Sequence, residues 1–173
     1  MNTSMIGDPK EWETFQEDWR KQCEHYGENF DEYSASALQI ISDFFEHGIQ
    51  SSSADGEHSV LGIADGENTY HCVCLLNHTP QKGYPGKVLR VRHMTLSPYY
   101  DFEDLSEDAY ADTLTDFILA LLDVSKTKAA DTLKIHLRSP LEARFLGQLA
   151  SVLEKAKVIR GTKRSGMWLD INP

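Results

Sequence analysis

The sequence predicts an α/β (α+β) fold with a mixed, mostly antiparallel central sheet flanked by about four helices. Three observations lead to this prediction. Two segments near the start have apolar residues at helical spacing, three segments with strand character follow them, and helical and strand segments alternate in the second half. A length of 173 residues with 40% hydrophobic residues is typical of one globular domain, and we expect residues 1–173 to form it.

Two helices are expected within residues 9–47. Apolar residues at helical spacing predict the first over Pro9–His25, where Asp8 before Pro9 is typical of a helix start and Gly27 of a helix end. A second apolar face predicts a helix over Asp31–His47 that stops at Gly48. The residues that form these two faces are Trp12, Phe15, Trp19, Leu38, Ile41, Phe44 and Phe45.

Three strands are expected within residues 58–98. A polar loop, Ser51–Gly56, precedes them. The first two, His58–Ala64 and Thr69–Leu76, are joined by Asp65-Gly66, which is a tight hairpin signal, so we expect them to pair antiparallel. The loop Thr79–Gly86 leads into a third strand, Lys87–Leu96, which Pro98 ends.

Residues 106–171 are expected to alternate between helices and strands. The strongest apolar stripe of the chain predicts a helix from Ser106 or Glu107 to Lys126. A buried strand, a helix and two short strands follow, over Thr132–Leu137, Pro140–Lys155, Val158–Gly161 and Met167–Ile171. We predict that the strands Lys87–Leu96 and Thr132–Leu137 lie side by side and parallel, joined by a right-handed crossover through the long helix.

The net charge of -10 is unevenly distributed along the chain. Residues 1–57 contribute -10 (13 acids, 3 bases) and residues 98–131 contribute -7 (9 acids, 2 bases), whereas residues 132–173 contribute +5 (8 bases, 3 acids). Because phosphates and anionic lipids repel an acidic protein, we expect neither nucleic acid nor a membrane as a partner.

The acidic segments have two interpretations. Either they face water and keep the protein in solution, or they meet a cationic small molecule or a basic protein surface. A homo-oligomer is a further candidate, because the acidic helices of one copy can attract the basic residues near the end of another. Those basic residues are Lys155, Lys157, Arg160, Lys163 and Arg164.

The cysteines and the apolar segments indicate the compartment. Cys23, Cys72 and Cys74 cannot all pair with one another, which favours reduced thiols. We expect no membrane span, because no segment reaches about 18 consecutive apolar residues. We expect no export signal, because Met1–Lys10 has no basic region followed by an apolar run. A cytoplasmic location is therefore predicted.

The predicted element order and three local sequences resemble the GNAT N-acyltransferase family over about residues 9–171. The local sequences are Met94–Pro98, Leu133–Leu137 with the helix that follows, and Met167–Ile171. The predicted order is the GNAT order without its first strand. The resemblance implies a GNAT-like sheet and acyl transfer from acetyl-CoA to an amine. It also implies cofactor binding near the end of the third predicted strand, by Leu96, Ser97, Pro98 and Ser106.

Two departures from the family pattern argue against the usual acetyl-CoA site. The family has an Arg or Gln and a Gly-x-Gly or Gly-x-Ala motif after the proline, because glycine lets backbone amides approach the pyrophosphate. Here Tyr99–Asp108 has no glycine and five carboxylates, each of which repels a charge at 4 Å by about 1 kcal/mol in water. The fourth helix has Phe145 and Leu146 where many members carry a proton-donating tyrosine. Acids are also favoured in any first helical turn, so a capped helix explains the loop.

Candidate catalytic residues are His93, Tyr99 and Tyr100. His93 is the residue near the strand end that could accept a proton from an amine, because imidazole has a pKa of about 6.5. Tyr99, Tyr100 or Tyr110 could replace the missing proton donor. The alternative for each is a packing role, with His93 hydrogen-bonded on a half-exposed strand.

A metal site was considered and is not expected. His71, Cys72, Cys74 and His78 lie close together in the sequence, but structural zinc sites use paired clusters with turns between them. Small cysteines buried in a sheet explain the pattern.

Three functional hypotheses remain open from the sequence. The first is a GNAT-fold, acyltransferase-like protein with a degenerate acetyl-CoA site that acts as a non-catalytic binding or regulatory module. The second is an active N-acetyltransferase that moves an acetyl group to a cationic amine through an atypical cofactor loop. The third is an unrelated α+β interaction domain with the same element order.

Overall fold

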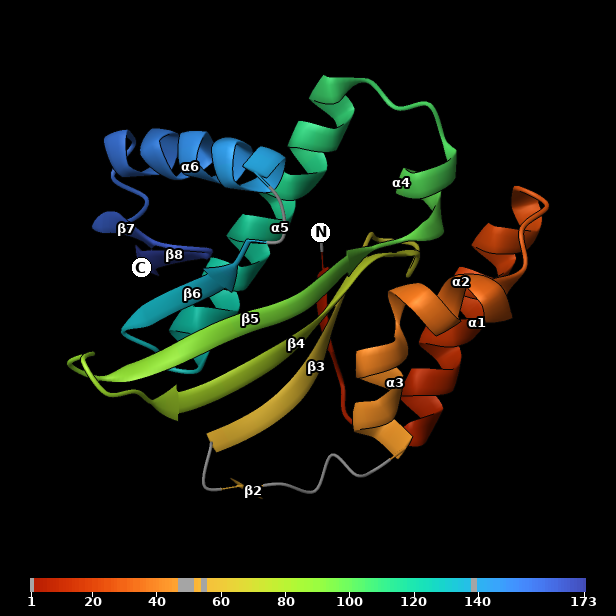
Figure 1. Ribbon diagram of the computed structural model, residues 1–173, viewed down its shortest axis with the longest axis horizontal. Helices are drawn as coiled ribbons and strands as arrows, with labels where there is room; N and C mark the ends of the chain where they lie inside the picture. The colour runs from red at the N-terminus through yellow and green to blue at the C-terminus, as the bar shows by residue number, and fades with distance from the viewer. Residues whose placement is uncertain (1, 47–51, 54–55, 138–139) are drawn as a thin grey trace.

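The computed structural model describes residues 2–46, 52–53, 56–137 and 140–173. An eight-stranded sheet runs through the molecule in the order β1-β3-β4-β5-β6-β8-β7, and β2 pairs with β3 beside this path (Figure 1). The strands are β1 Asn2–Ile6, β2 Ser52–Ser53, β3 Gly56–Ala64, β4 Tyr70–Pro80, β5 Lys87–Leu96, β6 Thr132–His136, β7 Gly161–Ser165 and β8 Trp168–Asn172.

Helices cover both faces of this sheet. In Figure 1 the first three helices form one group on one side of the sheet, and the last two lie on the other side. The helices are α1 Pro9–His25, α2 Phe30–Ala37, α3 Gln39–Glu46, α4 Pro98–Phe102, α5 Glu107–Thr127 and α6 Pro140–Lys155. No helix within the described ranges is both long and apolar enough to cross a bilayer.

The parallel strand pair predicted from the sequence is confirmed. β5 and β6 pair parallel from Val88 opposite Thr132 to Val91 opposite Ile135, and α5 lies between them in the chain. The other strand pairs are antiparallel. β5 continues to Leu96 beyond the part paired with β6, and the carboxyl ends of the two strands diverge in Figure 1.

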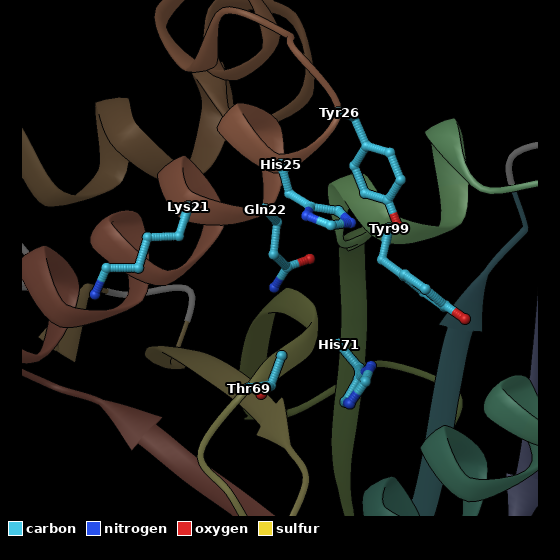
Figure 2. Close-up of a pocket in the computed structure, with 7 residues that line it drawn as sticks. All are labelled: Lys21, Gln22, His25, Tyr26, Thr69, His71 and Tyr99. Carbon is cyan, nitrogen blue, oxygen red and sulfur yellow. The ribbon is translucent and has the colours of Figure 1, made fainter.

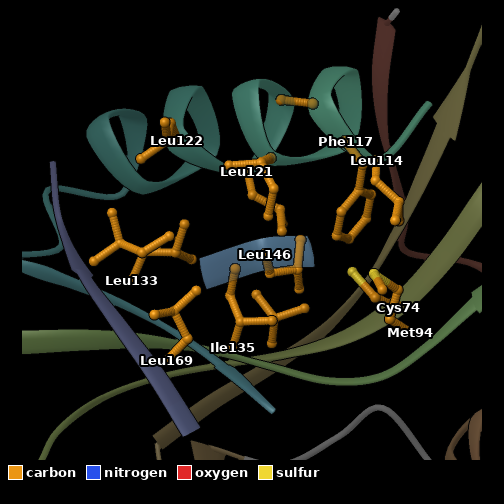
Figure 3. Close-up of a cluster of buried hydrophobic side chains, with 14 of the residues drawn as sticks. Cys74, Met94, Leu114, Phe117, Leu121, Leu122, Leu133, Ile135, Leu146 and Leu169 are labelled. Atoms are coloured by element: carbon orange, nitrogen blue, oxygen red, sulfur yellow. The ribbon is translucent and has the colours of Figure 1, made fainter. Parts of the chain in front are cut away.

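The larger hydrophobic core lies between the sheet and the helices α5 and α6. The apolar stripe of α5, from Leu114 to Leu122, faces Leu133 and Ile135 of β6 (Figure 3). Leu121 and Ile135 are completely buried there. Burial of these aliphatic side chains stabilises the crossover, because each contributes about 1.5–3 kcal/mol relative to exposure.

The second core lies on the opposite face, under α1. Trp12 and Phe15 stack along the helix, Trp19 packs against Phe15 at a tilt, and the indole nitrogen of Trp19 donates to the carbonyl of Tyr70 over 3.0 Å. A Cβ on Gly62 would lie 2.6 Å from the ring of Tyr70. Glycine at this position of β3 therefore leaves room for the ring of Tyr70, which meets Phe15 edge-on.

Two N-terminal predictions were wrong. β1 was not expected, because only its last residue, Ile6, is buried, and it pairs with β3. The predicted helix Asp31–His47 is two helices that meet at Leu38. The hydroxyls of Ser34 and Ser36 donate to carbonyls three residues earlier, and the hydroxyl of Thr95 donates to the carbonyl of Ala37. These side chains compete for the carbonyls that a continuous helix would use. The described residues thus contain six helices rather than about four. His47, Gly48, Ser51 and parts of the predicted polar loop lie outside them.

The strand predicted over Val158–Gly161 was also wrong. These residues end α6: Lys157 has a φ of 58°, its amide donates to Glu154 and the amide of Val158 donates to Leu153. This is the Schellman pattern, which satisfies the last carbonyls of a helix. β7 begins only at Gly161.

Candidate functional site

A cavity of about 410 Å³ opens where the end of α1, the start of β4 and the start of α4 meet. Figure 2 shows Tyr26 and His25 entering it from α1, His71 from β4 and Tyr99 from α4. The full lining is Lys21, Gln22, His25, Tyr26, Thr69, His71 and Tyr99. Aromatic rings from three separate elements therefore surround one space.

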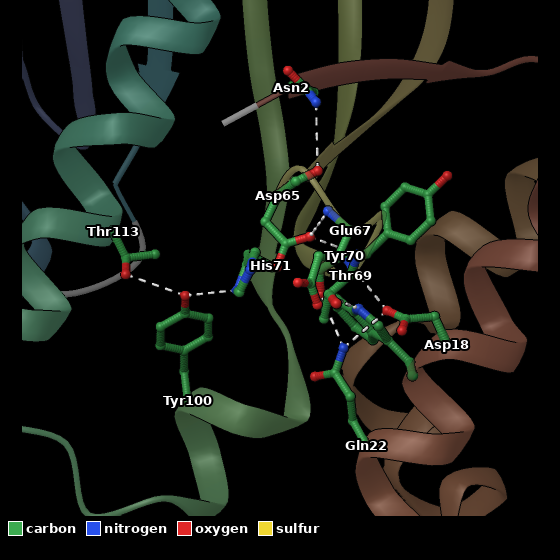
Figure 4. Close-up of polar contacts among 11 residues, drawn as sticks. Asn2, Asp18, Gln22, Asp65, Glu67, Thr69, Tyr70, His71, Tyr100 and Thr113 are labelled. Atoms are coloured by element: carbon green, nitrogen blue, oxygen red, sulfur yellow. Dashed lines mark hydrogen bonds and ion pairs between the residues drawn. The ribbon is translucent and has the colours of Figure 1, made fainter.

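One wall of the cavity carries a chain of hydrogen bonds centred on His71 (Figure 4). Its Nε2 lies 3.2 Å from Oδ2 of Asp65, and its Nδ1 lies 2.9 Å from the hydroxyl of Tyr100. The hydroxyl of Thr113 on α5 lies 3.2 Å from that of Tyr100. The chain joins the β3–β4 hairpin to α4 and α5.

The surroundings of this chain determine where its protons lie. Burial acts to raise the pKa of Asp65, but amide hydrogen bonds from Thr69 and Glu67 and the bond to His71 together lower it, so this carboxylate is ionised. Because an ionised carboxylate can only accept hydrogen bonds, Nε2 of His71 donates to Asp65, and Nδ1 accepts from Tyr100 in that tautomer. Burial raises the pKa of Tyr100, which keeps its phenol protonated. The protonated hydroxyl of Tyr100 therefore faces Nδ1 of His71 over 2.9 Å.

A second polar group lies behind the cavity wall. Oδ2 of Asp18 accepts from the amide of Tyr70 over 2.8 Å and from Nε2 of Gln22 over 2.9 Å. Burial raises the pKa of Asp18 in spite of these bonds. Oε1 of Gln22 is buried and has no hydrogen-bond partner among the described residues. The cavity wall thus offers an unused acceptor.

Two local backbone features bring His71 and Tyr100 together. Ile63 pairs with Cys72 and Ala64 with Tyr70, so His71 is an extra residue in β4, a β-bulge that redirects its side chain. The carbonyl of His71 accepts from the amide of Ser97 over 3.0 Å, just before α4. The bulge and this bond place the first turn of α4 beside the bulged residue.

The structure separates the three predicted catalytic residues. Tyr99 lines the cavity and Tyr100 joins its hydrogen-bond chain. His93 is half-buried at another irregularity, where β5 has one residue more than β4 between two paired positions. Its φ of 49° is in the left-handed region. His93 does not line the cavity.

The four predicted cofactor-binding residues belong to two different helix starts. Leu96, Ser97 and Pro98 are buried at the junction of β5 and α4, where the carbonyl of Leu96 accepts from the hydroxyl of Tyr33. Ser106 is exposed and caps α5, with its hydroxyl accepting from the amide of Ala109 over 3.2 Å. α4, which begins at Pro98, separates Leu96 and Ser97 from Ser106 along the chain. It is a short helix in the segment where the resemblance implies a cofactor loop.

These residues do not fit the pyrophosphate of CoA. The resemblance puts that group at the start of α5, where backbone amides would have to bind it. The hydroxyl of Ser106 already accepts a hydrogen bond from the amide of Ala109 there. The first turn also presents the carboxylates of Glu107 and Asp108. Asp101, Glu103 and Asp104 on the preceding segment are also exposed. The charge at this helix start repels a pyrophosphate.

His71 was overlooked as a candidate for proton chemistry, although it was considered as a metal ligand. The available signal was the hairpin, because Asp65 and His71 flank its turn and a turn brings its flanking residues together. Cys72 and Cys74 are buried in the core rather than gathered with His71 and His78. In the described parts of the chain, no group of three or more His, Cys, Asp or Glu side chains is placed to hold a metal.

Comparisons with known proteins give only distant likenesses. No protein-family model matches the chain, and no curated protein sequence matches it either. A KacTA–DNA complex is 10% identical, covers 98% of this chain and 91% of its own, and has a TM-score of 0.48. A spermidine N-acetyltransferase SpeG chimera from Vibrio cholerae and hSSAT is 10% identical, with 99% and 93% coverage and a TM-score of 0.46. An N-acetyltransferase from Staphylococcus aureus is 10% identical, with 99% and 93% coverage and a TM-score of 0.44.

The fold assignment rests on the chain's own strand order and pairing. β1 supplies the first strand that the predicted order lacked, and the parallel pair of β5 and β6 lies where the resemblance requires it. The remaining strands extend the sheet antiparallel on both sides. The chain has a GNAT-like fold: a mixed, mostly antiparallel sheet with helices on both faces.

Proposed function

We propose that this protein is an acyltransferase-like binding or regulatory module whose acetyl-CoA site is degenerate. One observation carries the proposal. The start of α5 is capped by Ser106 and presents the exposed carboxylates of Glu107 and Asp108 in its first turn, with three more on the segment just before it, so it repels the pyrophosphate that the family binds there. The cavity between α1, β4 and α4 remains as a place for another ligand.

Isothermal titration with acetyl-CoA and with desulfo-CoA tests this proposal. Desulfo-CoA has the pyrophosphate and lacks the thiol, so it reports on the nucleotide part alone. We expect no saturable heat with either compound up to millimolar concentration. Saturable binding in the micromolar range would overturn the proposal and favour an enzyme.

A second candidate function is acetyl transfer from acetyl-CoA to a cationic amine. The hydrogen-bonded chain Asp65–His71–Tyr100 favours it, because the protonated phenol of Tyr100 beside the cavity can give its proton to the departing thiolate of CoA. The test is release of free thiol from acetyl-CoA in the presence of primary amines. Activity that disappears in Tyr100→Phe and persists in Tyr99→Phe would support transfer, and absence of thiol release would discard it.

The three cysteines support a reducing compartment for either function. All three are free and buried in the structure. Free thiols persist where glutathione keeps them reduced, so a cytoplasmic location belongs to the proposal. A cationic small molecule or a basic protein surface is the partner that the acidic charge favours, and a second copy of the chain is a further candidate.

A further inference from the structure

We propose that the surface over α4 docks a peptide segment of another protein that is rich in lysine or arginine. We define this α4 surface by the rings of Tyr26, Tyr99, Phe102 and Tyr110 and the carboxylates of Asp101, Glu103, Asp104, Glu107 and Asp108. The inference rests on the proposed function, because it assigns a partner to the binding module.

Aromatic rings are unusually exposed on the α4 surface. Tyr99, Phe102 and Tyr110 are 37%, 36% and 37% exposed. Phe102 lies 6.0 Å from the ring of Tyr26 at the end of α1, and Tyr110 lies 6.4 Å from Tyr100. The rings therefore extend from α1 across α4 to α5. Apolar residues gathered in this way mark an interaction site, unlike single exposed ones.

The charge around these rings selects a cationic partner. The chain has no lysine or arginine between Arg92 and Lys126, whereas the five carboxylates of the α4 surface lie within this stretch. Tyr26 donates to Glu103 over 3.0 Å and Tyr33 donates to Asp101 over 2.8 Å, which holds these two carboxylates beside the rings. Aromatic faces and carboxylates together attract ammonium and guanidinium groups.

The surface of α1 is less suited to this role, although this helix carries as many acids as the α4 surface. Glu17 pairs with Arg20 and Lys21, and Arg20 also lies 3.4 Å from Asp31. Asp18 is half-buried and bound to Tyr70. Part of the negative charge of α1 is therefore compensated within the helix and its neighbour.

The cavity gives one cationic side chain of the peptide a defined position, because the charge of Lys21 in its lining is paired with Glu17 over 3.7 Å. Tyr26 and Tyr99 belong to both the α4 surface and the cavity lining. Oε1 of Gln22, which has no partner among the described residues, is an acceptor in that lining. A peptide fits better than a small amine, because the exposed rings continue past the cavity to Tyr110 on α5.

Fluorescence anisotropy of labelled octalysine at low salt tests the proposal. We expect saturable binding to the full chain and none to octalysine with acetylated side chains, which has the same backbone without the charges. Tyr99→Ala combined with Phe102→Ala should weaken binding about tenfold, since two aromatic faces that contact cations are lost. Tyr99→Ala alone should give a smaller loss and serves as the second variant if the double variant is misfolded.

A matched control removes exposed apolar side chains elsewhere. Leu119→Ala combined with Val152→Ala affects residues that are 38% and 60% exposed, and it should leave octalysine binding unchanged. Failure of octalysine to bind, or equal binding by the aromatic variant and the control, would overturn the proposal. Self-association that octalysine reverses, measured by light scattering, would assign the surface to a second copy and also overturn it.

The proposed function and the docking surface fail in different measurements. Saturable acetyl-CoA binding would overturn the proposal that the acetyl-CoA site is degenerate, and it would not affect the octalysine titration. Loss of octalysine binding would overturn the docking surface and would not affect the acetyl-CoA titration.

Discussion

Individual residues set the chemistry of the cavity through their burial and their partners. His71 is held on both ring nitrogens, by the ionised Asp65 and by the protonated Tyr100. Asp18 lies close by and shows the opposite behaviour to Asp65, because burial raises its pKa whereas amide hydrogen bonds lower that of Asp65. Two carboxyl groups of the same type therefore respond differently to pH.

Tyr100→Phe removes the hydroxyl that is hydrogen-bonded to His71 and to Thr113. We expect the free energy of unfolding to fall by about 1 kcal/mol, the net worth of a typical protein hydrogen bond. Urea denaturation measures it. Tyr99→Phe is the control, because no described residue is hydrogen-bonded to its hydroxyl, and an equal loss in both variants would contradict a role for the bond to His71.

Asp18→Asn tests the raised pKa of the buried carboxyl. A carboxyl whose folded pKa is above its unfolded value of 3.8 contributes stability below that value, and the contribution is lost as pH rises through the folded pKa. The stability of Asp18→Asn relative to wild type should therefore increase as pH rises from about 4 to 7. Denaturation across this pH range measures the difference.

At the scale of elements, α5 and α4 have different roles. α5 supports the crossover between the parallel strands, with its apolar stripe buried against β6. α4 replaces a cofactor loop with a short helix that presents rings and carboxylates. We therefore expect substitutions in the buried stripe of α5 to change the free energy of unfolding, and substitutions in α4 to change ligand binding.

Leu121→Ala leaves a cavity in the core under α5. Leu121 is fully buried, so we expect the free energy of unfolding to fall by about 3 kcal/mol, within the usual range for buried leucines. Leu119→Ala on the same helix changes a side chain that is 38% exposed and should cost less than about 0.5 kcal/mol. Similar losses in both would show that α5 does not pack as described.

Neutralising the carboxylates of α4 and its exit tests the electrostatic argument against CoA. The triple variant Asp101→Asn, Glu103→Gln, Asp104→Asn keeps acceptors for Tyr33 and Tyr26 while removing three charges. Any affinity for CoA should rise, because each carboxylate at 4 Å repels a charge by about 1 kcal/mol in water. Calorimetric titration of CoA into both proteins measures it. Weaker CoA binding by the variant would mean that these acids position the cofactor.

At the scale of the whole molecule, charge is segregated between two regions. The α4 surface and the first helices are acidic, while the exposed bases Lys163 and Arg164 lie on β7 at the edge of the sheet. Such a distribution permits attraction between copies as well as to a foreign partner. Docking of a basic segment at the α4 surface predicts that copies stay separate.

Light scattering and salt dependence test this distribution. Since exposed charges are screened beyond about 8 Å at physiological salt, affinity for octalysine should fall steeply as salt rises. The molar mass should remain that of one chain at low and high salt. A mass that decreases as salt rises would instead indicate that the acidic and basic regions of different copies associate.

The sequence by itself determined the elements whose pattern is local. Pro9–His25, Lys87–Leu96 and Pro140–Lys155 have the predicted bounds, because apolar periodicity, a capping residue or a proline acts within a few residues. The strand order around β5 and β6 also followed, since a long apolar helix between two strands favours a parallel crossover.

Only the tertiary structure decided the features that depend on distant partners. β1 exists through its pairing with β3, and the break at Leu38 involves a hydroxyl of Thr95, which no local pattern contains. The candidate site depends on a bulge that turns His71 toward Tyr100, 29 residues later in the chain. A bulge is set by the register of neighbouring strands, and a cavity by the elements that meet around it, so neither could be predicted from residue spacing along one segment.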